Sequence, residues 1–240
     1  MMTELKNLSI TLKTRPTGIV DSENFSTKIS EVKTLKENQV LIKVLYLSLD
    51  PYMRGRMSEA KSYADPLQIG EIITAESAGI VIESKSTKYS VGEYVCCRSG
   101  WQEYFISNDK DPMTYKVDPK LVPLSTYLGV CGMTGRTAYF GLMKEATPSK
   151  GETLVVSAAS GAVGSIVGQI GKKIGLNVIG IAGSDEKCNY VEDELNFDAC
   201  VNYKSASFRD ELASKLESGV DIYFESVGGS VTETVTEFFN

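Results

Sequence analysis

The sequence predicts an α/β protein in which a domain of short β-strands precedes a domain built on a doubly wound parallel sheet. Between residues 40 and 106, short apolar stretches are separated by glycines and show no helical periodicity. After Gly151, apolar strands alternate with amphipathic helices. Residues 153–171 then have the form of a buried strand, a tight glycine turn and the start of a helix.

The first half is expected to form a compact barrel or sandwich of short strands. The predicted strands are residues 40–47, 78–83, 94–97 and 101–106. Between residues 108 and 128 the periodicity is lost and three prolines occur, so the change of domain is expected there. The resulting division is 1–128 for the first domain and 129–240 for the second.

The second half begins with a helical stretch at about 135–144 and then repeats a strand–helix unit. The predicted strands are 153–157, 177–181, 199–202 and 220–224, and the predicted helices are 162–175, 186–195 and 207–216. Such alternation implies parallel strands joined by right-handed crossovers. A cofactor is expected beyond the carboxyl ends of these strands, at the point where their order reverses.

The glycine turn at 158–164 resembles a dinucleotide-binding fingerprint but departs from it. Gly161 and Gly164 would let backbone N–H groups approach a pyrophosphate at a helix N-terminus. Ala158 stands where the first glycine of G-x-G-x-x-G makes the sharp turn. A buried strand–helix unit of some other α/β protein is the alternative.

The end of the second predicted strand favours NADP(H) over NAD(H). An NAD-binding protein places an acidic residue there to hold the ribose 2′-hydroxyl. Here Ala182, Gly183 and Ser184 occupy the place, and Asp185 is explained as a helix cap. Ser184 and Lys187 could bind a 2′-phosphate; the alternative for Lys187 is a solvated helix residue.

Composition excludes several classes of function. The chain has 240 residues, a net charge of −6 and no histidine, which disfavours a nucleic-acid partner and removes histidine-based metal sites and catalysis. Its five cysteines form no C-x-x-C pair, which suits reduced thiols in a cytoplasmic protein. The first 16 residues lack a signal-peptide core, and no membrane span is expected. We therefore expect a small-molecule partner and no metal.

Five stretches resemble the medium-chain dehydrogenase/reductase superfamily, in its zinc-independent prostaglandin reductase and double-bond (alkenal/one) reductase branch. They are LSLDPYMRGRM (47–57), GWQEYF (100–105), GMTGRTAYFGLM (132–143), VSAASGAVGSIVGQIGKKIG (156–175) and the run between 179 and 229. The resemblance implies a GroES-like first domain and a Rossmann second domain. It also implies NADPH-dependent reduction of a C=C bond conjugated to a carbonyl, and a homodimer for the full-length protein.

The resemblance also implies roles for individual residues. Tyr52 would face the substrate, and Met133 and Thr134 would lie beside the nicotinamide. The pyrophosphate turn would be Gly161, Ala162, Val163 and Gly164, and the 2′-phosphate site would be Gly183, Ser184, Lys187 and Tyr203. Ser226 and Arg136 depart from the residues usual in the family. The glycines at 129, 132 and 135 are interpreted as close packing at the domain junction.

The expected reaction moves hydride to the β-carbon of an enone or enal, and negative charge develops on the carbonyl oxygen. The Tyr52 phenol or a ribose hydroxyl would donate a hydrogen bond to that oxygen. The alternative for Tyr52 is aromatic packing. Two other functions stay open: a zinc-free NADPH quinone oxidoreductase, and an NADPH-binding protein without turnover.

A doubly wound dinucleotide fold has six strands, whereas only four are predicted here. We therefore expect a C-terminally truncated chain that lacks a return segment completing the first domain. Its fourth strand would be an open edge, and the isolated chain would bind NADPH weakly and turn over poorly or not at all.

Overall fold

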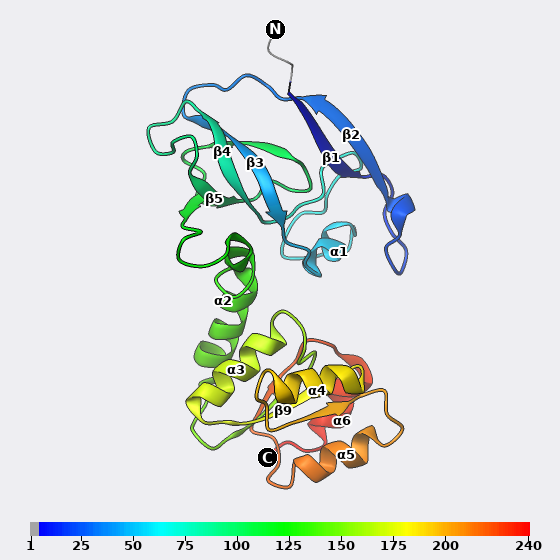
Figure 1. Cartoon of the computed structure of the whole chain (residues 1–240). Coiled ribbons are helices and arrows are strands. Elements are labelled where there is room, and N and C mark those ends of the chain that lie inside the picture. Colours follow the sequence, from blue (N-terminus) through cyan, green and yellow to red (C-terminus); the bar gives the residue numbers. More distant parts are fainter. Residues whose placement is uncertain (1–4) are drawn as a thin grey trace. The chain divides into compact units, whose positions relative to one another are not determined.

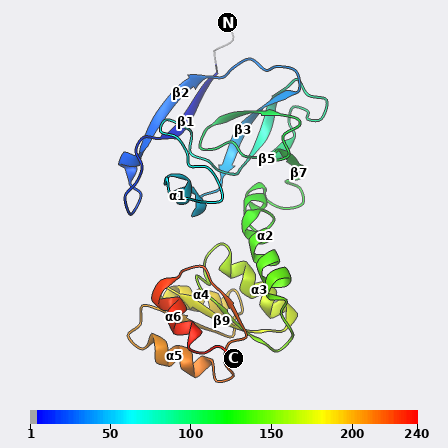
Figure 2. The same ribbon diagram turned by 180° about the vertical axis from the view of Figure 1, so that it is seen from behind.

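The computed structural model describes residues 5–240 and divides into two compact units, Met1–Leu128 and Gly129–Asn240 (Figure 1). The first unit is largely β-structure, and the second combines a parallel sheet with helices, as the reverse view also shows (Figure 2). The predicted fold class, a GroES-like β domain followed by a Rossmann-type α/β domain, is confirmed. Within the described residues, no helix has the length and apolar character needed to cross a bilayer.

The first unit contains a five-stranded antiparallel sheet in the order β6-β3-β4-β5-β7. Its strands are β3 (Gln39–Leu47), β4 (Ser77–Ser84), β5 (Tyr94–Cys97), β6 (Tyr104–Asn108) and β7 (Tyr115–Val117). A hairpin of β1 (Lys6–Leu12) and β2 (Phe25–Glu31) forms a second sheet beside it (Figures 1 and 2). The short helix α1 (Tyr52–Arg56) follows β3, and 3-10 turns lie at Ser22–Asn24 and Leu124–Leu128.

Alternating apolar residues of these strands bury one face of the sheet. Val40, Ile42, Val81 and Val95 are fully buried and pack together with the ring of Tyr89. The Tyr89 hydroxyl donates a hydrogen bond of 2.6 Å to the carbonyl oxygen of Thr114, which satisfies its polar end inside the core. The sheet therefore provides a fixed support for the loops at the ends of its strands.

The second unit has a four-stranded parallel sheet in the order β10-β9-β8-β11. The strands are β8 (Thr153–Val156), β9 (Asn177–Ala182), β10 (Ala199–Asn202) and β11 (Ile222–Phe224). The helices are α2 (Met133–Phe140), continued by a π-helical turn (Gly141–Ala146), α3 (Gly164–Ile174), α4 (Asp185–Asp193), α5 (Phe208–Lys215) and α6 (Gly229–Thr236). The order reverses between β8 and β11, so a switch point lies at their carboxyl ends.

Successive residues of β8 point to opposite faces of this sheet, and each face has its own core. Leu154 and Val156 belong to a cluster that includes Val167 of α3 and Val191 of α4. Val155 belongs to another cluster, which includes residues of α5 and α6. Strands buried on both faces explain the nearly continuous apolar runs in the sequence.

Several predicted elements differ from the observed ones. The strand expected at 101–106 is β6, Tyr104–Asn108. Gly100 has φ +70°, and Trp101 leaves the strand path to stack on the Phe25 ring, with centroids 5.5 Å apart. Strands β1, β2 and β7 and helix α1 were not predicted.

Candidate active site

The turn after β8 is shaped by a residue in the left-handed backbone region. Ala158 has φ +49°, which L-residues other than glycine rarely adopt. Its carbonyl oxygen accepts the N–H of Gly161 at 2.8 Å, and the N–H of Ala159 donates to Ile181 of β9 at 3.0 Å. The alanine in place of the first fingerprint glycine therefore makes the same sharp turn, at a conformational cost.

Two glycines let the chain pass close to that carbonyl. A Cβ atom on Gly161 would stand 3.0 Å from the carbonyl oxygen of Ala158, and one on Gly164 would collide with it. Gly164 is the first residue of α3, so its lack of a side chain brings the helix N-terminus against the turn. Packing alone therefore requires a glycine at position 164 and favours one at position 161.

The turn offers unpaired backbone donors. Among the residues described, the N–H groups of Ala162 and Val163 donate to no protein acceptor. They lie directly before α3, whose first turn carries no acidic side chain. Free N–H groups and a helix N-terminus together form a site for an anionic phosphate. The residues present therefore fit the pyrophosphate of a dinucleotide.

The end of β9 brings together the four residues predicted to bind a 2′-phosphate. A Cβ on Gly183 would lie 3.2–3.4 Å from ring and hydroxyl atoms of Tyr203, so the tyrosine covers the glycine closely. The N–H of Tyr203 donates to the carbonyl oxygen of Ala182 at 3.0 Å. Ser184 precedes α4, and Lys187 is exposed on its first turn.

The helix cap is Ser184, and the assignment of that role to Asp185 was wrong. The Ser184 hydroxyl accepts the N–H of Lys187 at 3.3 Å, because its extended backbone aims the side chain back over the helix start. Asp185 is the first helical residue, and its carboxylate accepts the side-chain amide of Asn202 at 2.8 Å. Ser184 keeps its own hydroxyl proton for a ligand.

At the switch point, a buried serine after β8 is hydrogen-bonded to the segment that follows β11. Ser157 is fully buried, and its hydroxyl oxygen accepts the N–H of Ser226 at 2.7 Å. This bond uses the backbone of Ser226, so it does not depend on which side chain stands at that position. Next to it, the N–H groups of Val227 and Gly228 donate to the carboxylate of Glu225 and hold its pKa below the usual range.

The predicted nicotinamide residues lie at the start of α2. Met133 is the first residue of this helix, and Thr134 is 8% exposed. The Thr134 hydroxyl oxygen is buried and has no hydrogen-bond partner among the described residues, an arrangement that a ligand could satisfy. Arg136 is exposed on the following turn. A Cβ on Gly135 would collide with the Val130 backbone, so that glycine serves close packing.

Tyr52 is half-buried in the first unit, at the start of α1. Burial raises the pKa of its hydroxyl above the ordinary value of 10.0. The carboxylates of Asp50 and Glu76 add to this rise, whereas a hydrogen bond with the Thr74 side chain opposes it. The phenol is therefore protonated at neutral pH and can donate a hydrogen bond.

Sequence reasoning missed the groups that surround Tyr52. Thr74 and Glu76 come just before β4, and Arg98 directly follows β5, with its Nη2 3.8 Å from the Glu76 carboxylate. Asp50 has a buried carboxylate oxygen without a hydrogen-bond partner among the described residues. The available signal was the position of these polar residues at strand ends, where loops meet at one edge of a sheet.

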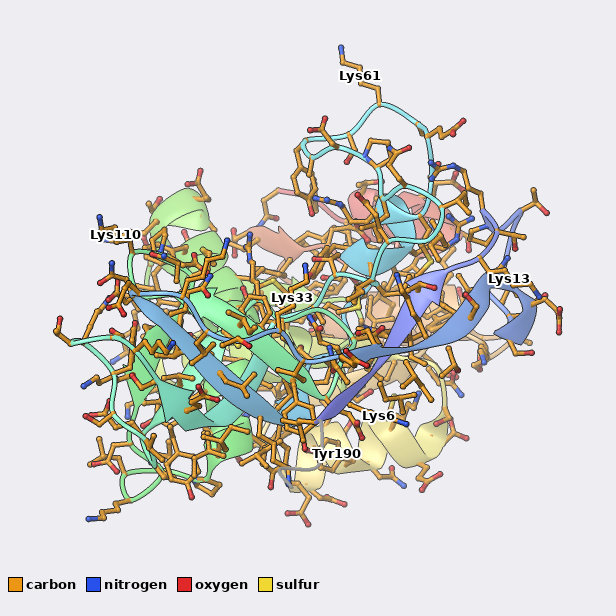
Figure 3. The ribbon with its side chains drawn as sticks, turned by 90° about the horizontal axis from the view of Figure 1, so that it is seen from above. Lys6, Lys13, Lys33, Lys61, Lys110 and Tyr190 are labelled. Atoms are coloured by element: carbon orange, nitrogen blue, oxygen red, sulfur yellow. The ribbon has the colours of Figure 1, made fainter. Side chains whose placement is uncertain are left out.

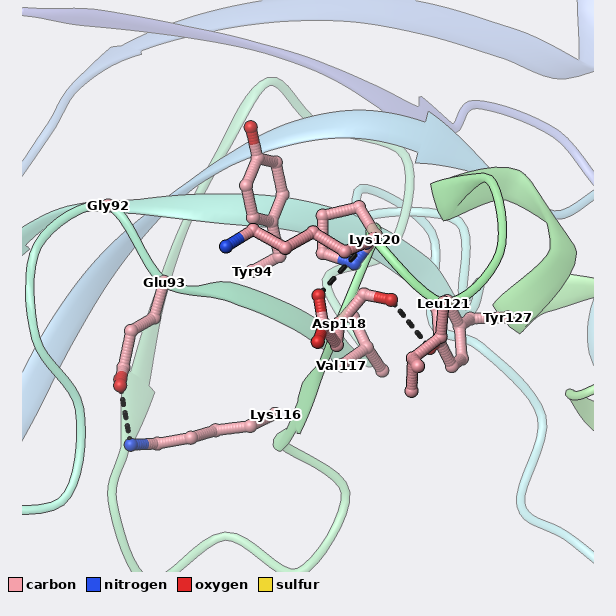
Figure 4. A pocket seen from close by; sticks show the side chains of 10 residues that line it. Gly92, Glu93, Tyr94, Lys116, Val117, Asp118, Lys120, Leu121 and Tyr127 are labelled. Carbon is pink, nitrogen blue, oxygen red and sulfur yellow. Dashed lines mark hydrogen bonds and ion pairs between the residues drawn. The ribbon is translucent and has the colours of Figure 1, made fainter.

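A groove of about 620 Å³ lies elsewhere on the first unit, between β5, β7 and the residues that follow (Figure 4). Two of its charged side chains neutralise each other, since Lys116 pairs with Glu93 at 2.7 Å. The backbone N–H of Lys120 likewise donates to the Asp118 carboxylate. None of the predicted site residues lines this groove, so its size does not make it the candidate site. Within residues 5–240, no group of three potential metal ligands lies together.

Two family profiles match the chain. One, described as the N-terminal domain of oxidoreductase, matches residues 9–115. The other, described as zinc-binding dehydrogenase, matches residues 162–239. The two matches fall on the β-rich unit and on the parallel-sheet unit.

Characterised relatives are similar over nearly the whole chain. NADPH-dependent curcumin reductase of Escherichia coli is 44% identical over 235 residues, which are 98% of this chain and 68% of that protein. The NADP(+)-dependent 2-alkenal reductase of Nicotiana tabacum is 41% identical over 98% of this chain and 70% of its own length. Prostaglandin reductase 1 of Bos taurus is 42% identical over 92% of this chain and 65% of its own length.

A solved structure gives the same result. CurA from Vibrio vulnificus in complex with NADPH superposes with a TM-score of 0.93 and 46% sequence identity, over 97% of this chain and 68% of that one. Since sequence identity, coverage and fold agree, the chain belongs to the medium-chain dehydrogenase/reductase family, in the branch of the prostaglandin and alkenal reductases.

Proposed function

We propose that this protein uses NADPH to reduce the C=C bond of α,β-unsaturated aldehydes or ketones. The observation that carries the proposal combines two features. The glycine turn after β8 has backbone N–H groups without acceptors among residues 5–240, and no acidic residue stands directly at the end of β9. Ala162 and Val163 offer free N–H groups, and Lys187 offers a cation instead of a carboxylate. Relatives named for NADPH-dependent curcumin reduction and NADP(+)-dependent 2-alkenal reduction support the same chemistry.

The second unit would bind the cofactor, which supplies hydride from its nicotinamide ring when bound. Gly161, Ala162, Val163 and Gly164 would hold the pyrophosphate at the N-terminus of α3. The 2′-phosphate would lie against Ser184, Lys187 and the Tyr203 ring, close to Gly183. Met133 and the unpartnered hydroxyl of Thr134 would contact the nicotinamide side.

Tyr52 would donate a hydrogen bond to the carbonyl oxygen of the substrate as negative charge develops there. A preorganised donor stabilises such charge better than water does, because it needs no reorganisation during the reaction. The raised pKa keeps this phenol protonated, so that it remains a hydrogen-bond donor. The proton that reaches the α-carbon would come from solvent.

We propose that this chemistry is zinc-independent. A chain with no histidine and no C-x-x-C pair lacks the ligand types that catalytic zinc sites commonly combine. The hydrogen bond from Tyr52 would take the place of a Lewis acid at the carbonyl oxygen. Carboxylates of Asp50 and Glu76 nearby would disfavour ionisation of the phenol and so preserve the donor.

The protein would act on a small molecule in the cytoplasm, and the full-length protein would form a homodimer.

The test is to mix the chain with NADPH and to follow nicotinamide absorbance as enals, cyclic enones and quinones are added in turn. Oxidation with enals or enones, and formation of the saturated carbonyl product, would support the proposal. Turnover of quinones alone would indicate a quinone oxidoreductase. NADPH binding by calorimetry without turnover of any acceptor, by the chain and by its full-length form alike, would indicate a binding protein.

A further inference from the structure

Helix α1 presents a second polar side chain on the same face as Tyr52. Arg56 is four residues further along this helix, so the two side chains lie one turn apart on one face. No residue in 5–240 forms a hydrogen bond or ion pair with the Arg56 guanidinium, and its Nε is buried. A buried N–H of a charged group without an acceptor is costly, and such a group calls for a ligand.

Neighbouring arginines differ, because their guanidinium groups are occupied. Arg54 donates to the carbonyl oxygens of Pro16 and Gly18, and thereby ties α1 to the segment after β1. Arg15 pairs with Glu59 at 2.8 Å and also donates to Met57. Arg98 has Glu76 as its partner. Unlike these three arginines, Arg56 does not connect described segments of this unit through hydrogen bonds or ion pairs of its guanidinium group.

Arg56 lines a hollow of about 380 Å³ together with Thr74, Arg98, Ser99 and Gly100. Thr74, which lines this hollow, is also a neighbour of Tyr52, because its side chain acts on the pKa of the Tyr52 hydroxyl. The carboxylate in the lining, Glu71, accepts the N–H of Gln68 at 2.8 Å. A small molecule held by Tyr52 could thus extend into a hollow that contains an unneutralised guanidinium.

We propose that Arg56 is a specificity residue that binds a carboxylate on the substrate while Tyr52 contacts its carbonyl oxygen. The preferred substrates are then enones or enals that carry a carboxylate group. The inference rests on the proposed reduction of C=C bonds and names the substrate class for it. Guanidinium groups favour carboxylates because both are planar and can form two parallel hydrogen bonds.

The geometry also limits the spacing of the two groups on the substrate. Residues four apart on a helix are separated by about 6 Å along its axis. A carboxylate a few bonds beyond the β-carbon therefore suits the pair better than one attached directly to it. The probe is a methyl enone that carries a carboxylate two methylenes beyond the β-carbon, compared with its methyl ester and with longer homologues.

The experiment has a binding arm and a turnover arm. Calorimetry measures how the 240-residue chain binds the saturated keto acid and its methyl ester, and steady-state kinetics measures kcat/KM for the unsaturated pair. The variants are Arg56→Met, which removes the charge, and Arg56→Lys, which keeps it. The matched control is Lys61→Met, which removes one positive charge from the same segment; Lys61 is exposed and extends into solvent (Figure 3).

The proposal predicts that the affinity and the kcat/KM of the wild-type chain are about 10- to 100-fold higher for the acid than for the ester. This ratio corresponds to the contribution of a charged hydrogen bond. Arg56→Met should remove this preference in both arms, Arg56→Lys should retain part of it, and Lys61→Met should leave it unchanged. Circular dichroism and thermal unfolding establish that each variant is folded.

Other outcomes would overturn the inference in distinguishable ways. Turnover of the ester without preference for the acid would refute the role of Arg56 and leave the proposed reduction intact. An equal loss on acid and ester in Arg56→Met would assign Arg56 to structure. A weaker NADPH affinity with unchanged acid preference would assign it to a cofactor phosphate. Failure of both probes to turn over, with the acid preference still present in calorimetry, would refute the proposed reaction and keep the carboxylate site.

Discussion

The carbonyl oxygen of Ala158 lies so close to the α-carbon of Gly164 that no side chain fits between them. Ala158, near the beginning of the turn after β8, has φ +49°, and Gly164 is the first residue of α3. The contact holds the helix N-terminus against the turn, where the N–H groups of Ala162 and Val163 are free. The same two residues therefore determine both local stability and the shape of the proposed phosphate site.

Gly164→Ala should destabilise the second unit and impair NADPH binding. The new methyl group would collide with the Ala158 carbonyl, and overpacking of this kind costs about 1–3 kcal/mol. Urea unfolding measures the stability, and calorimetry measures the NADPH affinity. Ser165→Ala, at the next position of α3, adds no atoms and should change the stability by less than about 0.5 kcal/mol. Equal stability of Gly164→Ala and the wild type would contradict the observed contact.

Ala158→Gly should stabilise the chain, in contrast to most substitutions by glycine. Glycine adopts positive φ without the steric penalty, which is about 1–2 kcal/mol for an L-residue, although it loses more backbone entropy on folding. We expect a net gain of about 0.5–1 kcal/mol by urea unfolding. Ala159→Gly is the control, because Ala159 is fully buried without positive φ and should lose stability. A loss in both variants would contradict the strain at Ala158.

Lys187→Ala should weaken binding of NADPH by about 10- to 100-fold, because a charged hydrogen bond contributes roughly 1.5–3 kcal/mol. NADH has no 2′-phosphate, so its affinity should hardly change. Calorimetry with both cofactors provides the measurement. Lys173→Ala, an exposed lysine in the last turn of α3, is the matched control and should affect neither cofactor. Equal losses for NADPH and NADH would show that Lys187 acts on structure alone.

Tyr52→Phe should lower kcat more than it lowers NADPH affinity, since the ring is retained and only the donor is lost. Removal of one donor to a developing oxyanion costs up to about 100- to 1000-fold in kcat, less where water substitutes. Because burial raises the Tyr52 pKa above 10.0, the donor is present throughout the neutral range. It is lost only as pH rises through that raised value.

The pH profile separates this role from packing. In the wild type, the contribution of the Tyr52 hydroxyl to kcat should stay constant at neutral pH and should fall only in strongly alkaline solution. The Phe variant should lack that alkaline fall. An unchanged kcat for Tyr52→Phe on several enones would assign the residue to packing.

The parallel-sheet unit could be predicted from the sequence because local patterns determine it. Each of its strands is an apolar run followed by a helical period, and the pairing of neighbours follows from right-handed crossovers. The hairpin of β1 and β2 was missed because most buried positions of β1 are polar, namely Asn7, Ser9 and Thr11. Leu8 and Ile29 face each other across this hairpin and are 37% and 65% exposed. Because polar residues occupy the buried face, the apolar alternation does not reveal this strand.

The candidate site could be predicted only where it follows one continuous stretch. The turn at 158–164 and the end of β9 are local, and the predicted strands before them end within about one residue of β8 and β9. The surroundings of Tyr52 come from three separate loops, which carry Asp50, Thr74 and Arg98. No periodicity links those positions, because the antiparallel sheet joins them through long-range pairing. The strain at Ala158 is likewise visible only in the backbone angle.

The central claim is hydride transfer to the β-carbon of an enone, and an isotope experiment tests it most directly. The chain is mixed with NADPH deuterated at the transferring position of nicotinamide C4 and with a methyl enone, and the product is analysed by NMR. We predict deuterium on the β-carbon of a saturated ketone. Deuterium on the former carbonyl carbon of an allylic alcohol would contradict the account.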